Sequence, residues 1–162
     1  MSGEKLARPR RRLQVIRPVF GRQEVVCAVL SAFLLTAAFR PFAMAWVAWL
    51  ALVPIGWAVC RMSRWGALQL GLLCGVMHWI ASVWWVGKVT VAGMLALALY
   101  CALYFAPPLL VWRGWHRRYG WAGWKGVGGI LVVACAWCGA EQVRATLLTG
   151  FPWNALGVTQ VE

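Results

Sequence analysis

The chain has 162 residues, of which 62% are hydrophobic and only 12% are charged; it contains thirteen tryptophans, and its mean hydropathy is +0.70. Soluble domains average about 45–50% apolar and about 25% charged residues, so this composition excludes an ordinary soluble domain and indicates an integral membrane protein. The net charge of +12 would suit nucleic acid, but most of the sixteen cations lie before residue 23 or in short gaps between apolar runs, which is typical of membrane topology signals.

A basic segment, residues 1–24, opens the chain. The run RPRRR followed by VVCAVLSAFLLTAA has features of a secretory signal peptide: a basic start, an apolar run and small residues. The basic part is longer than in a signal peptide, however, and further apolar runs follow. We therefore expect residues 1–24 to form a cytoplasmic segment and residues 25–39 to form an uncleaved first span.

Four further apolar segments follow, near residues 43–60, 65–86, 89–112 and 126–148. A helix needs about 20 apolar residues to cross the hydrocarbon core, and the five segments approach or meet this length. They are apolar on all sides and lack the short alternating runs of barrel strands. The sequence predicts an all-α fold, a polytopic bundle of about five transmembrane helices over residues 25–148. Prolines inside two of the segments are compatible with such a bundle.

The cations are distributed unevenly over the two sides of this alternating topology. One side receives thirteen: Lys5, Arg8, Arg10, Arg11, Arg12, Arg17, Arg22, Arg61, Arg64, Arg113, Arg117, Arg118 and Lys125. The other side receives Arg40, Lys88 and Arg144. Cytoplasmic loops of membrane proteins are enriched in Lys and Arg, so the N-terminus is predicted to be cytoplasmic and the closing TGFPWN segment to lie on the outer face.

Cysteine and histidine give no sign of a metal or redox centre. The six cysteines lie within or at the edges of apolar segments, where Cys behaves as a small hydrophobe, and CAWC at 135–138 lacks the βαβ context of a redox motif. His78 and His116 have no ligand partners at suitable spacing. We expect no metal site and no cofactor.

One face of the fifth predicted span carries Trp137, Glu141 and Arg144, spaced i, i+4 and i+7. Charged groups inside spans are functional hypotheses by default, and Glu141 is the one acid within a span. Glu141 and Arg144 are placed to pair at i, i+3. Either the pair stabilises the bundle near its outer end, or it braces the segment that follows.

The closing segment, residues 149–162, is the most specific feature of the sequence. Gly150 and Pro152 are expected to end the helix, which places Phe151, Trp153 and Asn154 at the outer interface. This aromatic loop suits contact with acyl chains and headgroups, or equally an anchor between two spans. Arg40, in FRPF at 39–42 on the same face, is either a partner for lipid phosphate or simply solvated.

Three stretches together resemble a known family: AAFRPFAMAWVAWLALVPIGW, the W…GAE..R pattern of Trp137 to Arg144, and TGFPWNALGVTQ at 149–160. They are similar, in this order and spacing, to the membrane part of bacterial apolipoprotein N-acyltransferases, and the resemblance covers about residues 25–160. Arg40 departs from the family, in which proline or another small residue usually precedes Pro-Phe.

The resemblance implies a location in the bacterial inner membrane and a defined chemistry. Members of the family transfer an acyl chain from a phospholipid to the N-terminal diacylglyceryl-cysteine of a lipoprotein, through a thioester. It also implies that phospholipid and lipoprotein are the partners. The residues expected near the lipid entrance are Phe151, Pro152, Trp153, Asn154 and Arg40.

The family's catalytic Glu, Lys and Cys belong to a nitrilase-like domain, which these 162 residues do not contain. We therefore expect no catalytic residue in the chain, a truncated or split protein that is inactive alone, and activity only with a separate chain that carries the hydrolase domain. The alternative is a non-catalytic membrane scaffold or partner subunit. A small transporter is disfavoured, because no span carries several polar residues at helical spacing.

Overall fold

The computed structural model describes residues 20–39, 41–148 and 150–161, and within these ranges the chain is helical, with turns and no strand. The α-helices are α1 Arg22–Ala38, α2 Ala48–Ala51, α3 Val53–Arg61, α4 Arg64–Ser82, α5 Val91–Ala102, α6 Ala106–Tyr119 and α7 Trp124–Thr146. Short 3-10 helices are η1 Ala45–Val47, η2 Trp84–Lys88, η3 Leu103–Phe105 and η4 Leu156–Gln160. The predicted all-α fold is confirmed for this part of the chain.

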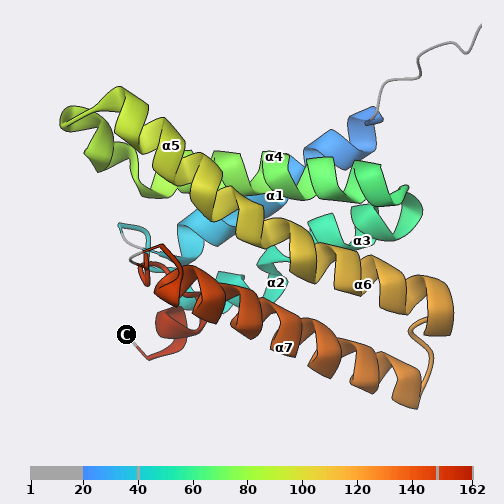
Figure 1. Ribbon diagram of the computed structural model, residues 1–162. Coiled ribbons are helices and arrows are strands. Elements are labelled where there is room, and N and C mark those ends of the chain that lie inside the picture. The colour runs from blue at the N-terminus through green and yellow to red at the C-terminus, as the bar shows by residue number, and fades with distance from the viewer. Residues whose placement is uncertain (1–19, 40, 149, 162) are drawn as a thin grey trace, which may run out of the picture.

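The helices run back and forth between two ends of one bundle (Figure 1). The start of α1, the α3–α4 turn and the α6–α7 turn lie at one end, which we call the basic end because Arg61, Arg64, Arg117 and Lys125 belong to these turns. The loop after α1, η2 and the residues after α7 lie at the opposite end. α4 packs against α1, α5 and α6, and α7 packs mainly against α6.

The second apolar segment is a short apolar helix, Ala45–Arg61, made of the consecutive elements η1, α2 and α3. Pro54 stands in the first turn of α3, where its missing N–H would in any case have no partner within the helix. The neighbouring first-turn donor, the N–H of Ile55, is satisfied from α1 by the Ser31 hydroxyl at 3.0 Å, in the buried interior. A buried hydrogen bond from α1 therefore holds the first turn of α3.

The fourth segment is longer than predicted, because α5, η3 and α6 form one uninterrupted rod from Val91 to Tyr119. Pro107 and Pro108 open α6 instead of kinking a finished helix. This rod and α7 are the two helices in the described ranges that are long and apolar enough to cross a membrane. The third segment ends earlier than expected, at Ser82, and continues as η2.

Small residues bring α4 close to the α5–α6 rod. A Cβ added at Gly75 would lie 2.9 Å from the Cα of Ala102, and one at Gly71 would lie 3.0 Å from Leu109 Cδ1. These two glycines, four residues apart on α4, permit the close approach of the two helices. Next to them His78 is buried, with its Nδ1 3.1 Å from the Thr36 hydroxyl. Outside this core the surface stays apolar: Trp49, Trp65 and Trp124 are 76%, 74% and 88% exposed.

Candidate functional site

The face of α7 that carries Trp137, Glu141 and Arg144 is turned toward the segment that follows the helix. We call these three residues the α7 clasp and residues 150–161 the motif segment. α7 ends at Thr146, and the chain then folds back so that the N–H of Phe151 donates to the carbonyl oxygen of Arg144 at 3.0 Å. The motif segment therefore returns along the last turns of the helix that precedes it.

Arg144 is the central residue of the clasp. Its side chain is only 3% exposed, and its Nη1 donates to the carbonyl oxygens of Phe151 at 2.6 Å and Trp153 at 2.9 Å. The guanidinium also lies over the ring of Trp79, 4.7 Å from its centroid. A buried charge is costly unless hydrogen-bonded, and here two motif carbonyls and an aromatic face supply the compensation.

Glu141 holds the other half of the motif segment. Its Oε1 accepts hydrogen bonds from Trp137 Nε1 and from the backbone N–H of Leu156, each at 2.9 Å. The hydrogen bonds of Glu141 and Arg144 thus go to the same segment, while the two side chains do not bond to each other within the described residues. The positive group binds carbonyls and the negative group binds an N–H, as each charge requires.

The backbone of the motif segment makes a tight reversal. Gly150 has φ of +75°, and a Cβ at this position would collide with the Ala145 carbonyl oxygen. Asn154 also adopts a left-handed conformation, with φ of +54°, which Asn tolerates better than most residues. The residue types at 150 and 154 are therefore those that the turn needs.

The two aromatic residues of the motif segment have different environments. Phe151 is half-buried and meets Trp79 edge-on, with ring centroids 5.8 Å apart, so it anchors the segment to the core. Trp153 is 60% exposed and lies near Trp85 of η2, 6.1 Å away. Pro152 between them is exposed as well. Arg40 lies outside the described residues.

Gln160 closes the far end of the motif segment and was not among the residues that the sequence singled out. Its Nε2 donates to the carbonyl oxygen of Ala45, and its Oε1 accepts from Trp49 Nε1, each at 2.9 Å. These partners precede it by more than a hundred residues. For Gln160 the available signal was its place at the end of TGFPWNALGVTQ. Trp79, which contacts Arg144, was also missed, and no local pattern points to it.

A deep groove starts beneath the motif segment and runs along the bundle. Its volume is about 950 Å³, and its walls come from α2 and α3 on one side and from α6 and α7 on the other. η4 and the clasp residues Trp137 and Glu141 line one end, while Arg61 and His116 line the other. A second cavity, of about 20 Å³, lies below Arg144 among His78 and Trp79.

The clasp positions the motif segment through side chains that are engaged in hydrogen bonds. The motif segment has no Cys, Lys or Asp, and the carboxylate of Glu141 is engaged. Over the described ranges no group of three or more His, Cys, Asp or Glu side chains is placed to hold a metal ion. Cys135 and Cys138 are exposed free thiols, although they share the spacing of a redox pair.

The sequence is similar to that of known proteins. A family model, the apolipoprotein N-acyltransferase N-terminal domain, matches residues 31–162. The chain is 33% identical over 151 residues to the apolipoprotein N-acyltransferase of Geobacter metallireducens, covering 86% of this chain and 27% of that protein. It is 32% identical over 143 residues to that of Azotobacter vinelandii, covering 83% of this chain and 24% of that protein. The chain therefore spans about a quarter of the length of these curated relatives, and it belongs to the apolipoprotein N-acyltransferase family.

Proposed function

We propose that the chain is the membrane domain of an apolipoprotein N-acyltransferase, crossing the bacterial inner membrane about five times with its N-terminus in the cytoplasm. The concentration of cations at the basic end supports this orientation. Two helices long enough to span and an exterior rich in exposed tryptophan support the membrane placement. The motif segment then lies at the outer face.

The role proposed for this domain is to hold Pro152 and Trp153 toward the lipid phase, beside the place where acyl transfer occurs. The buried Arg144, bonded to the carbonyl oxygens on both sides of Pro152, is the observation that carries this proposal. A rigid clasp beneath two exposed side chains fixes the position of a binding surface, since supported groups stay closer to a productive geometry than those on a free loop.

The reaction is proposed for the whole protein: transfer of an acyl chain from phospholipid to the α-amino group of a diacylglyceryl-cysteine at a lipoprotein N-terminus. The nucleophile and its acid–base partners would come from a hydrolase domain, in the same or a separate polypeptide. In this division of labour the described residues orient the lipid and the catalytic domain performs covalent catalysis.

A chimera tests the proposal. This chain would replace the matched region of the Geobacter relative, and mass spectrometry would measure N-acylation of a lipoprotein in cells depleted of their own enzyme. We expect acylation by the chimera, a large loss for Arg144→Ala, and little change for Arg118→Ala, an exposed cation on α6. A folded chimera that leaves every lipoprotein unacylated would refute the role and favour a non-catalytic scaffold.

A further inference from the structure

The groove is apolar along its length. Its α7 wall is a stripe at i, i+3, i+4 spacing formed by Ile130, Val133, Ala134, Trp137 and Cys138. The rest of the lining is also largely apolar and aromatic and includes Leu52, Trp57 and Trp112. A volume of about 950 Å³ with mostly hydrophobic and aromatic walls is typical of a site for an elongated apolar ligand.

Polar groups are confined to the two ends of the groove, and the ends differ in charge. Glu141 and Gln160 at the outer end are already hydrogen-bonded within the protein. At the basic end Arg61 lines the groove, with its guanidinium 4.3 Å from the centroid of the Trp57 ring, and His116 lies across from it. The ligand that fits has an apolar body and an anionic end.

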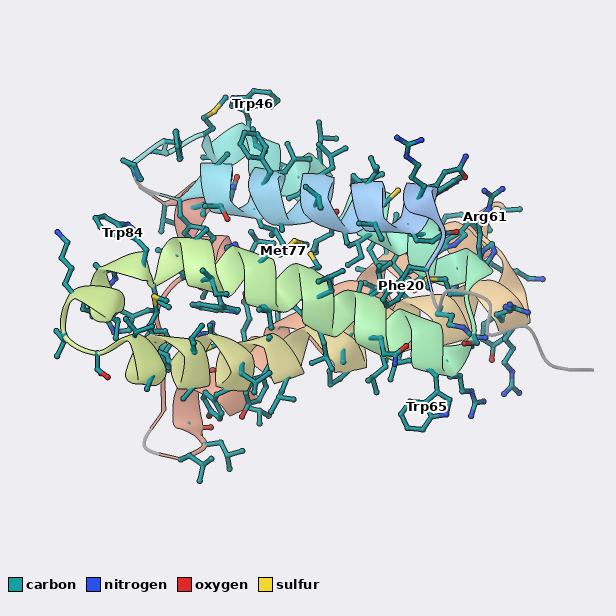
Figure 2. The ribbon with its side chains drawn as sticks, turned by 90° about the horizontal axis from the view of Figure 1, so that it is seen from above. Phe20, Trp46, Arg61, Trp65, Met77 and Trp84 are labelled. Carbon is teal, nitrogen blue, oxygen red and sulfur yellow. The ribbon has the colours of Figure 1, made fainter. Side chains whose placement is uncertain are left out.

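Further cations surround Arg61. The side chains of Arg113 and Arg117 both donate to the carbonyl oxygen of Met62, the residue after Arg61, at 2.8 and 3.5 Å. This places three guanidinium groups around the C-terminal end of α3, and the nitrogens of neighbouring side chains gather near Arg61 in Figure 2. Among the described residues no carboxylate forms an ion pair with these arginines. Glu24, the described acid at the basic end, lies against Gly21 at the start of its own helix.

We propose that the groove binds an anionic phospholipid, with the phosphate at Arg61 and the acyl chains along the α7 stripe. Basic pockets between membrane helices on the cytoplasmic side suit anionic headgroups, and an arginine fork matches a phosphate. With the orientation proposed above, this lipid belongs to the cytoplasmic leaflet, at the end of the bundle opposite the motif segment. It is a resident lipid, separate from the acyl donor.

Lipid retention by the purified 162-residue chain is the direct test. The protein in detergent is titrated with phosphatidylglycerol or phosphatidylcholine, and native mass spectrometry counts the bound lipid. At high salt, the bound lipid is instead extracted and measured after gel filtration. We expect one phosphatidylglycerol per chain in preference to phosphatidylcholine. In about 0.5 M salt, where diffuse attraction is screened, Arg61→Ala should weaken retention roughly tenfold, whereas Arg118→Ala should leave it nearly unchanged.

Substitutions at two adjacent positions on α7 test whether the acyl chains lie along this wall of the groove. Ala134 lines the groove, whereas Cys135 is also exposed but is not part of the groove lining. Ala134→Trp should abolish retention, while Cys135→Trp should not; circular dichroism and the melting temperature show that both variants are folded. Glycerophosphate without acyl chains should not compete.

Three outcomes would overturn the proposal: equal loss for Arg61→Ala and Arg118→Ala, equal retention of phosphatidylcholine, or a stable dimer that fills the groove with a second chain. Because retention is read without any acylation, these results are independent of the chimera experiment. A failed chimera with intact lipid retention would count against the proposed function alone.

Discussion

Removing the Arg144 side chain should release the motif segment from α7. Arg144→Ala deletes two charge-assisted hydrogen bonds, each of which contributes about 1.5–3 kcal/mol, and leaves the carbonyl oxygens of Phe151 and Trp153 without their donor. It also deletes the contact with the Trp79 ring, for which about 0.5–2 kcal/mol is typical. These contributions are not additive, and we expect a net local destabilisation of about 3–5 kcal/mol.

Hydrogen exchange measures this local stability. A loss of about 3 kcal/mol corresponds to more than a hundredfold faster exchange at the amides of Phe151 and Leu156, which are bonded in the clasp. Arg144→Lys keeps the positive charge but loses the planar guanidinium, so the exchange rate in this variant should fall between those of the unchanged protein and Arg144→Ala. Unchanged exchange at residues 150–161 in a folded Arg144→Ala protein would refute the clasp. Arg118→Ala, which removes an exposed cation, serves as the control.

Three further results are expected. Glu141→Ala should lower the melting temperature, because it strips the N–H of Leu156 and the indole of Trp137 of their acceptor; Glu141→Gln keeps an acceptor and should recover most of the loss. Gly150→Ala should cost about 2 kcal/mol or more in chemical unfolding, since the left-handed backbone and the Ala145 carbonyl both oppose a Cβ. Trp153→Ala should reduce lipoprotein N-acylation by the chimera without lowering its melting temperature, because the side chain is 60% exposed; full acylation would remove Trp153 from the lipid entrance.

The positions of the helices follow from the apolar segments, because each run must be helical to satisfy its backbone away from water. Their interruptions were harder to predict. Pro54 lies in the first turn of α3, where the N–H of Ile55 depends on a hydroxyl from another helix, Ser31, and local spacing does not reveal this partner. The extension of α6 to Tyr119 was missed because its last turn carries His116, Arg117 and Arg118, which are polar but suit a helix C-terminus.

Within the site, helical spacing groups Trp137, Glu141 and Arg144 on one face, since this requires only 3.6 residues per turn. Spacing also predicted that Glu141 and Arg144 pair with each other, because it reveals only contacts between neighbours on a helix. In the structure both side chains bond to the motif segment instead. The acceptors of Arg144 depend on a chain reversal at Gly150. The contacts of Gln160 depend on tertiary folding over more than a hundred residues, which no local pattern encodes.

The bonds from Gln160 to Ala45 and Trp49 also fix an order of assembly during synthesis. Contacts between residues so far apart in sequence close a long loop, and closing it costs entropy and slows their formation. A ribosome has to deliver α7 and the whole motif segment before η1 and α2 acquire these partners. Until then the outer end of the groove wall formed by α2 and α3 is held by its packing against α1, so the two bonds of Gln160 are a late addition to a wall that is already in place.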